Sequence, residues 1–463
     1  MSAKQVLVAD FFKDDFPSYA AYDNTRKIAS YIDGMKNSQR KIVYTMCNKY
    51  PKDFIKSETL ANVCAAYTNY LHGAANLGGV IDTLAQAFVG ANNYPLLIGN
   101  SGGFGTRINP TCAASRYTRV ALEGLNSGKK KVSPIKSMLH KDDDEIIGRQ
   151  FFESEYIEPK FFVPIFPLLF LNGSSGLSTG FSQDIYPRNP EEIITYIKKK
   201  LSGTAAPRMS LLPWFKGHTG KVVVNSETNS VESWGVIVRN NTTSYTITEL
   251  PIGIEYQKYI EFLNKLYENG TIQDYDDDCD TKTEQICFKI KTTRDFTKKH
   301  ADDRKLMESL KLIKSLPETL NCIDENGRVR EFKSVTEILD AYIDIRLKFY
   351  QKRKDWLLKK IRSELEKLSS KYLFIKGIVE GTIVVNKKTK DEIVKQLEKN
   401  PKIFKIDGNY DYLLALSIHS LTKEKMEELK NQIITKKDEF NTIKNETIEQ
   451  MWNDDLHELK KVL

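Results

Sequence analysis

The last third of the chain carries the clearest periodic pattern of apolar residues. From Ile338 to Ile375, and again from Met426 to Thr447, apolar residues recur in alternating steps of three and four. This spacing is typical of a coiled-coil seam and predicts two long helices. The segment between them, residues 377–420, is rich in turn residues. Two long helices joined by a small head predict an antiparallel coiled-coil arm, although a generic helical hairpin would give the same pattern.

The middle of the chain changes to short apolar runs separated by Asn-rich and Ser-rich turns. Between Lys221 and Lys291 these runs are KVVVN, WGVIV, SYTIT and ICFKIK. They predict strands, and a helical pattern at Tyr256–Tyr267 interrupts them. This region is therefore expected to be mixed α and β.

Two shorter helical patterns lie nearer the amino terminus. One follows Ser57 and reaches Tyr67, and the other runs from Leu77 to Phe88, with a glycine-containing turn at Leu71–Asn76 between them. The pair fits a helix-turn-helix, whose second helix would approach a DNA groove in a winged-helix module. Helical hairpins are common, so the pattern alone is not specific.

Length and charge limit what the chain can be. Its 463 residues predict three or so units rather than one core. The net charge of +8, from 69 basic and 61 acidic residues, is modest, so any nucleic-acid surface has to be local. Acidic neighbours are scarce around two basic runs, which favours phosphate contact over a solvated lysine-rich face. These runs are Lys36, Arg40, Lys41, Lys49, Lys52 and Lys56, and then Lys129, Lys130, Lys131 and Lys136.

Several absences restrict the chemistry further. The six cysteines show no CxxC spacing and are expected to be reduced thiols. The acidic clusters Asp142–Glu145 and Asp276–Asp280 lack the spacing of a calcium loop, so no metal site is predicted in this chain. No GxxxxGK[ST] phosphate loop and no long apolar segment occurs, which predicts a cytoplasmic protein without its own ATPase.

The segment Tyr94–Val120 holds the strongest candidate for chemistry. Four glycines, at 99, 102, 103 and 105, precede the small residues Ala113, Ala114 and Ser115, and then Arg116 and Tyr117 follow. A phenol attacking a phosphodiester needs a nearby cation, because the phosphate is itself negative and few free tyrosines are ionised near neutral pH. Arg116 and Arg107 could supply that charge, and the product would be a phosphotyrosyl ester. The alternative is an ordinary tyrosine beside a salt-bridging arginine.

Leu177 is the one large apolar residue in the run NGSSGLSTG. Such a run builds a core poorly, but it can push a side chain between stacked bases and so bend a duplex. An apolar loop residue covered by another domain is the alternative.

Ordered motifs along nearly the whole chain resemble those of type IIA DNA topoisomerases, in the cleavage subunit that corresponds to gyrase A. The motifs are DGMKNSQRKIVYTM from Asp33, YLHGAANLGGVIDTLAQAF from Tyr70, the Tyr117 segment, FPLLFLNGSSGLSTGF from Phe166, LLPWFKGHTG from Leu211 and ITELPIGIEYQKYIEFL from Ile247. The sequence departs from the family in three places: Asn37 replaces a usual proline, Leu71 a usual histidine, and Leu177 a common isoleucine.

The resemblance implies roles for particular residues. Tyr117 would be the nucleophile and Arg116 would stabilise the transition state, while Arg40 and His72 would hold or protonate the scissile phosphate. Leu177 would be the wedge. Further DNA contacts are expected from Lys36, Lys41, Lys56, Arg107 and Ser115.

The resemblance also implies an α+β, multidomain fold. The expected parts are an N-terminal arm that contacts the partner subunit (1–32), a winged-helix cleavage domain (33–160), a mixed α/β tower (161–335), an ascending coiled-coil helix (336–376), a C-gate dimerisation head (377–420) and a descending coiled-coil helix (421–463).

The expected function is transient double-strand cleavage of DNA through 5′-phosphotyrosyl links, for relaxation or decatenation. A homodimer would act with a separate subunit that binds ATP and Mg²⁺, and the compact chain resembles the medium subunit of T-even-like bacteriophages. A tyrosine recombinase fits less well, because it needs further arginines and a histidine shortly before its tyrosine. A non-enzymatic winged-helix protein dimerised by its coiled coil is the remaining alternative.

Overall fold

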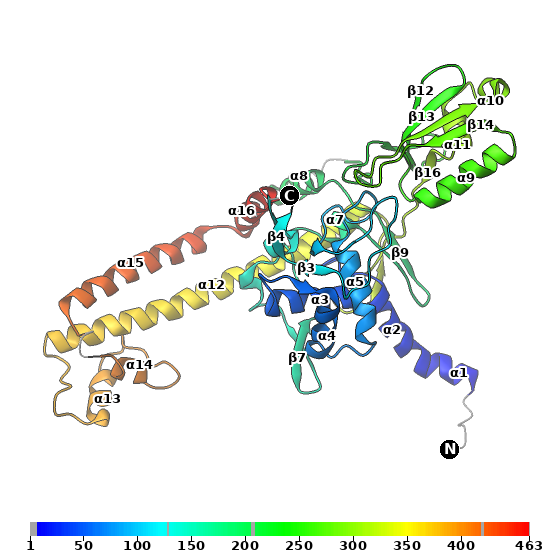
Figure 1. The fold of residues 1–463 in the computed structure, drawn as a ribbon. Coiled ribbons are helices and arrows are strands. Elements are labelled where there is room, and N and C mark those ends of the chain that lie inside the picture. The colour runs from blue at the N-terminus through cyan, green and yellow to red at the C-terminus, as the bar shows by residue number, and fades with distance from the viewer. Residues whose placement is uncertain (1–6, 127–128, 205–208, 418–420, 463) are drawn as a thin grey trace. The chain divides into compact units, whose positions relative to one another are not determined.

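The computed structural model describes residues 7–126, 129–204, 209–417 and 421–462. The chain divides into two compact units. Unit 1 comprises Met1–Arg346 with Asp455–Leu463, and unit 2 comprises Leu347–Asp454. The elements are labelled in Figure 1. Their mixture of helices and sheets confirms the expected α+β, multidomain fold.

Unit 1 opens with a helical segment and then the helix-turn-helix. The first helices are α1 (Val8–Asp10), the π-helical η1 (Phe11–Asp15), α2 (Phe16–Lys27) and α3 (Asn37–Lys49). The predicted pair follows as α4 (Ser57–Tyr67) and α5 (Ala74–Ala85). Helix α5 begins three residues earlier than its apolar pattern, directly after Gly73, whose φ of 77° ends the turn. It ends at Ala85 because Gln86 is extended.

Short antiparallel sheets surround these helices (Figure 1). Strand β3 (Arg119–Ala121) lies between β1 (Ile55–Lys56) and β2 (Ile98–Ser101). The antiparallel pairs that follow are β4 (Glu123–Asn126) with β5 (Lys129–Val132), β6 (Arg149–Phe152) with β7 (Glu155–Pro159), and β8 (Ser174–Leu177) with β9 (Ser182–Ile185). Between them lie α6 (Pro134–Met138), the 3₁₀ turn η2 (Lys141–Asp143) and α7 (Leu169–Asn172), and α8 (Pro190–Leu201) comes after β9.

The four apolar runs predicted as strands between Lys221 and Lys291 lie in two sheets, which also contain further strands. The first has the order β10 (Lys221–Val224), β11 (Val231–Trp234), β16 (Ile313–Ser315). The second has the order β12 (Val236–Arg239), β13 (Ser244–Glu249), β15 (Phe288–Thr292), β14 (Ile272–Asp277). Helices α9 (Tyr256–Glu268), α10 (Arg294–Lys299) and α11 (Asp303–Ser309) complete this part, and β17 (Asn321–Ile323) pairs with β18 (Val329–Glu331).

One apolar cluster holds the second sheet and its helices together. Tyr245, Ile247 and Phe288 from the strands pack with Tyr259 and Leu263 from α9. Each of these side chains is almost completely buried. The two sheets β10–β11–β16 and β12–β13–β15–β14, with α9 to α11, are called the sheet module below.

The two long helices predicted from the heptad pattern are present. Helix α12 (Val335–Val379) has 45 residues, and α15 (Lys423–Asn445) has 23. Within unit 2, Lys436 pairs with Glu364 at 2.9 Å, and Lys354 donates to the carbonyl of Glu446 at 2.6 Å. The lower-numbered residue of α12, Lys354, lies opposite the higher-numbered partner, Glu446, so the two helices run antiparallel.

The head between these helices has its own small core. It contains α13 (Lys390–Glu398) and α14 (Asp411–Leu414). Its buried side chains are Phe374, Ile383, Leu397, Ile403, Tyr410 and Leu413. The turn-rich segment between the long helices therefore has an apolar core of its own.

The prediction of a single descending helix over residues 421–463 is wrong. Helix α15 ends at Asn445, Glu446 is extended, and a separate helix α16 (Ile448–Lys460) follows. Thr447 fits the heptad spacing, but it caps α16: its hydroxyl accepts from Gln450 N at 3.2 Å, and its own N–H donates to Gln450 Oε1 at 2.9 Å. This reciprocal capping box starts a new helix.

We expect substitution of Gly34, in the DGM turn, to lower the free energy of unfolding. Its φ is +65°, and an added Cβ would lie 2.3 Å from Leu169 N. Gly270 is a matched control, because its φ is +66° and nothing lies within 4 Å of an added Cβ. Gly270→Ala should cost about 1 kcal/mol for the left-handed conformation alone, and Gly34→Ala a further 1–3 kcal/mol, roughly, for overpacking.

The measurement is the thermal unfolding midpoint of the full-length chain by calorimetry. Gly34→Ala should lower that midpoint by more than Gly270→Ala does. Equal shifts would show that the backbone near Leu169 moves aside freely.

Candidate functional site: an anchored tyrosine loop

Tyr117 stands at the end of a loop, residues 102–118, that connects β2 to β3. The two strands pair in antiparallel register, with Ile98 opposite Ala121 and Ser101 opposite Arg119. The side chain of Tyr117 is 63% exposed, whereas Thr118 and Val120 are fully buried. The loop therefore turns its phenol outward directly before a buried strand begins.

Buried polar contacts fix the base of this loop. Thr118 Oγ1 lies 2.8 Å from Asp82 Oδ1 on α5 and 2.7 Å from Ser57 Oγ on α4, within hydrogen-bond distance of both. The first amides of α4 also bind the loop: Ser57 N donates to Thr118 O at 3.0 Å, and Glu58 N donates to Ser115 O at 3.1 Å. Otherwise unpaired amides at a helix start thus position the chain on both sides of Tyr117.

Two glycines allow the close approach that these contacts need. A Cβ on Gly78 of α5 would lie 2.8 Å from Ser115 Oγ, and a Cβ on Gly102 would lie 2.7 Å from Tyr117 O. Ser115 is half-buried, and its side chain packs against α5 at Gly78. The helix-turn-helix and the tyrosine loop are one packed assembly.

Cationic side chains gather on the exposed side of the loop. The Arg116 guanidinium lies 5.0 Å from the centre of the Tyr117 ring. Lys56 is exposed and is the cross-strand neighbour of Arg119, which is also exposed. Like charges directly opposite each other destabilise a strand pair, so this arrangement favours a bound anion. Sequence reasoning missed Arg119, although its alternation with buried Thr118 and Val120 could have indicated it.

His72, which is predicted to contact the scissile phosphate, lies at the turn between α4 and α5. Its Nε2 is hydrogen bonded to the hydroxyl of Tyr22 on α2, and its ring meets that of Tyr70 edge-on at 5.5 Å. Burial and the nearby Arg26 lower the pKa of the His72 imidazole. Leu71, which stands where the family has a histidine, is 71% exposed.

Two predicted DNA-facing residues are instead engaged inside the protein. Arg40 donates to Asp33 at 2.6 and 3.0 Å and to Met35 O at 3.0 Å. Lys41 Nζ lies 2.8 Å from Glu158 and 2.6 Å from Thr68 O. Both side chains are only 8% exposed. The expectation that Lys41 contacts DNA is corrected, because its ammonium already has buried partners, and Arg40 orders the DGM turn.

Leu177 projects from a firmly held hairpin. It ends β8, and its side chain is 77% exposed. The next two residues bind α2: Ser178 Oγ donates to Asn24 Oδ1 at 2.6 Å, and Thr179 Oγ1 donates to Asp23 Oδ2 at 2.8 Å. Lys36 Nζ donates to Ser175 O at 2.5 Å, and burial lowers the pKa of that ammonium. The hairpin therefore presents an apolar tip on a fixed base, and Lys36 supports the hairpin.

Arg107 also makes an ion pair within the protein rather than lying free. It contacts Glu249, the last residue of β13, and donates to Leu250 O at 3.0 Å. Its side chain is 12% exposed, so its charge is largely engaged within the protein.

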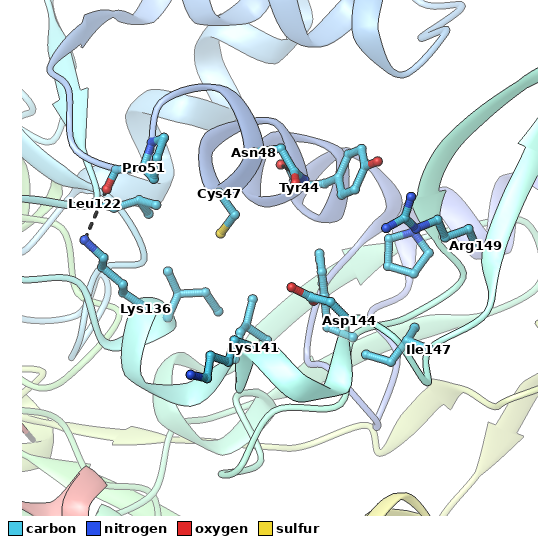
Figure 2. A pocket seen from close by; sticks show the side chains of 14 residues that line it. Tyr44, Cys47, Asn48, Pro51, Leu122, Lys136, Lys141, Asp144, Ile147 and Arg149 are labelled. Carbon is cyan, nitrogen blue, oxygen red and sulfur yellow. Dashed lines mark hydrogen bonds between the residues drawn. The ribbon is translucent and has the colours of Figure 1, made fainter. Parts of the chain in front are cut away.

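Unit 1 also contains a hollow that none of the residues of the tyrosine loop line. This cavity of about 230 Å³ is lined by Tyr44, Cys47, Lys136, Asp144 and Arg149 among others (Figure 2). It holds none of the predicted catalytic residues. Burial raises the pKa of the Cys47 thiol to about 12, which makes it a poor nucleophile. Tyr117 is exposed at the end of its loop, as suits a large substrate.

The residues around Tyr117 do not form a metal site by themselves. In the part of the chain that the structure describes, no three His, Cys, Asp or Glu side chains gather closely enough to hold a metal ion. Asp82 is the carboxylate that anchors the tyrosine loop. It is 4% exposed and hydrogen bonded to Thr118, and burial raises the pKa of its carboxyl. The acidic residues Asp276 and Asp277 lie in β14, where Asp277 accepts from Tyr256. All six cysteines are free thiols, as expected.

Among the described residues, no helix is both long enough and apolar enough for a membrane crossing. Fold and site together define a multidomain α+β protein whose helix-turn-helix module presents an exposed tyrosine beside an arginine. Residues 26–457 match the DNA gyrase/topoisomerase IV family model, which describes the A-type subunits of these enzymes. The chain belongs to this family.

Relatives and a solved structure agree with this assignment. Over its whole length the chain is 31% identical to the mitochondrial DNA topoisomerase 2 of Dictyostelium discoideum, of which it covers 36%. It is 30% identical, over 98% of its length, to the DNA topoisomerase 2 of Invertebrate iridescent virus 6, of which it covers 39%. The chain thus spans about a third of the length of these relatives.

The solved structure is that of the Plasmodium falciparum topoisomerase II DNA-binding, cleavage and re-ligation domain. The match has a TM-score of 0.82 at 31% identity, covering 98% of this chain and 64% of that one. The α+β, multidomain fold of this chain therefore has a counterpart of known structure.

Glu249 generates a prediction about acid stability. Burial raises the pKa of its carboxyl, but hydrogen bonding from His218 and pairing with Arg107 outweigh burial and lower that pKa from 4.5 to about 2. A lowered pKa stabilises the fold above about pH 4.5, and this contribution is lost as the pH falls toward 2. Glu249→Gln should remove on the order of 2 kcal/mol of the stability lost between these pH values.

The measurement is urea unfolding of wild type and Glu249→Gln at roughly pH 6, above this window, and at about pH 4 and 3, inside it. Glu308→Gln, at an exposed carboxylate of the same module, is the control. If the wild type and Glu249→Gln lose stability equally between pH 4 and 3, the carboxyl does not titrate as stated.

Proposed function

We propose that this chain is the DNA-cleaving and religating part of a type IIA DNA topoisomerase, with Tyr117 as the nucleophile. The observation that carries the proposal is the exposed phenol of Tyr117, held on an anchored loop beside Arg116. The family membership supports it. The alternative of a non-enzymatic winged-helix protein does not account for a phenol presented in this way.

The proposed step is a transesterification. The Tyr117 oxygen forms a bond to phosphorus and gives up its proton, while the bond from phosphorus to the 3′ oxygen breaks and that oxygen takes a proton. Arg116 would pair with the non-bridging oxygens, where negative charge grows in the transition state. Lys56 and Arg119 would hold neighbouring phosphates. The 5′-phosphotyrosyl ester retains the bond energy, so the reverse step reseals the strand.

His72 and Arg40 act in supporting roles in this proposal. His72, with Tyr22 and Tyr70, lies at the helix-turn-helix turn and would contact the DNA beside the scissile phosphate. Arg40 would act indirectly, through the turn that it forms with Asp33. Lys36 would hold the Leu177 hairpin in place.

The assembly is proposed on the same basis. Two copies would join through the head at 377–420 and cleave the two strands, and the exposed aromatic residues of the 1–32 arm would contact a partner subunit. Mg²⁺ would bind mainly to that partner, because the described residues around Tyr117 do not gather into a metal site. ATP would bind to the partner as well, because this chain lacks a GxxxxGK[ST] phosphate loop. A subunit like the medium subunit of T-even-like bacteriophages would have this organisation.

The first test compares Tyr117→Phe with a matched tyrosine variant. Tyr156, on β7, is 64% exposed, nearly as much as Tyr117, so Tyr156→Phe removes an equally exposed hydroxyl. The full-length chain, its ATPase and metal-binding partner, Mg²⁺ and end-labelled duplex are mixed and trapped with detergent. Wild type and Tyr156→Phe should give a covalent adduct blocked at the 5′ end, and Tyr117→Phe should give none.

An adduct that persists in Tyr117→Phe would assign the nucleophile to another residue. Duplex binding by wild type without any adduct would favour the non-enzymatic alternative.

The second test concerns Leu177 as a wedge. Leu177→Ala should reduce the bend of a bound duplex, measured by fluorescence transfer between its ends, and slow cleavage about tenfold. That factor corresponds to roughly 1.4 kcal/mol of lost wedge contact. Val224→Ala truncates another exposed apolar side chain, on β10, and should change neither value. An unchanged bend in Leu177→Ala would exclude the wedge.

A further inference from the structure

Arg107 connects the tyrosine loop to a part of unit 1 distant in sequence. Its guanidinium pairs with Glu249 and donates to Leu250 O at 3.0 Å, at the end of β13. The next residue, Ile108, packs against the apolar cluster of the sheet module. Two consecutive loop residues, one charged and one apolar, therefore contact the same module.

Glu249 is itself held in one orientation. Its carboxylate accepts from Thr219 N and Thr219 Oγ1, each at 3.1 Å, and from Leu250 N at 2.8 Å. His218 Nδ1 lies 3.5 Å from its second oxygen, at the limit of a hydrogen bond. With 3% exposure, this is a desolvated and fully engaged anion. Arg107 thus meets a fixed partner, and breaking the pair would leave a buried charge.

The loop is stiff between Arg107 and Tyr117. Thr106 N donates to Asn109 O at 2.7 Å, and Ala113 N donates to Gly103 O at 2.8 Å. Gln86 of the segment after α5 donates to Pro110 O at 3.0 Å. These contacts fold the loop on itself, so a shift at Arg107 is carried to the residues just before the tyrosine.

We propose that Arg107 is a positioning residue, which with Ile108 clamps the tyrosine loop to the sheet module through Glu249 so that the module sets the position of Tyr117. The inference rests on the proposed function of Tyr117. It gives Arg107 a role through the protein in place of direct contact with a phosphate. A displacement of reacting groups by about 1 Å can cost a hundredfold in rate, which is why such a clamp matters.

The test is Arg107→Gln in the full-length chain with its partner subunit. At saturating duplex, the single-turnover rate of adduct formation should fall about 10- to 100-fold. The Kd for duplex should stay within about twofold, and its dependence on salt should not change, because no phosphate contact is lost. The double variant Arg107→Gln with Glu249→Gln should be no slower than the slower single variant, since the two residues act as one unit.

Arg304→Gln is the matched control. Arg304 pairs with Glu232 of β11 at 2.8 and 3.2 Å, so this variant breaks another arginine–glutamate pair of the same module away from the loop. It should lower the thermal midpoint and leave the cleavage rate unchanged. Equal slowing by both variants would show a general loss of stability and overturn the clamp. Weaker binding with a smaller salt slope in Arg107→Gln would make Arg107 a phosphate contact, which also overturns it.

Hydrogen exchange separates the clamp from the chemistry. Amides of residues 103–117 should exchange faster in Arg107→Gln than in wild type or Arg304→Gln, whether or not an adduct forms. Unchanged exchange would refute the clamp. An absent wild-type adduct would instead refute the proposed function of Tyr117, and the exchange result would still decide whether Arg107 holds the loop.

Discussion

The hydrogen bonds of Thr118 to Asp82 and Ser57 are the constraint on which the site depends. They bury the residue after Tyr117 and join both helices of the helix-turn-helix to the loop. Loops that carry chemistry are commonly mobile, and fixing each residue costs about 1–2 kcal/mol of conformational entropy. Here α4, α5 and β13 meet that cost with directional contacts. The exposed phenol is a fixed feature of the surface.

Charge in this protein is used first to build the fold and only then to face a ligand. Arg40 with Asp33, Lys41 with Glu158, and Arg346 with Asp143 are buried pairs. Pairs of this kind add little net stability because desolvation opposes attraction, but each one permits few alternative arrangements. The cations left exposed near Tyr117 are therefore fewer than the basic runs suggest, and Arg116, Lys56 and Arg119 form a small, defined patch.

Patterns with a short period were enough to predict most elements. The steps of three and four predicted α12 and α15, and short apolar runs between turns predicted β10, β12, β13 and β15, because both signals depend only on neighbours in sequence. The same reasoning failed for Lys41, whose partner Glu158 lies 117 residues away. No local pattern contains that contact. The break after Asn445 has a local signal, since Thr447 and Gln450 have capping-box spacing, but the heptad spacing continues across it and masks that signal.

The site was predicted in part, because some of its features are local in sequence and others depend on distant residues. Glycines and small residues before Arg116 and Tyr117 indicated an uncrowded phenol. In the structure the loop backbone passes close to Gly102, and the Ser115 side chain packs close to Gly78. The charge of Arg107 suggested a phosphate ligand. Its ion pair with Glu249 could not be predicted from local sequence, because Glu249 lies 142 positions further along the chain. Cleavage and resealing are the two directions of one reaction, so both pass through the same transition state and need the same placement of Tyr117. A loop fixed from several sides meets that need better than a mobile one, because the phosphotyrosyl oxygen stays where the departing 3′ oxygen can attack it again.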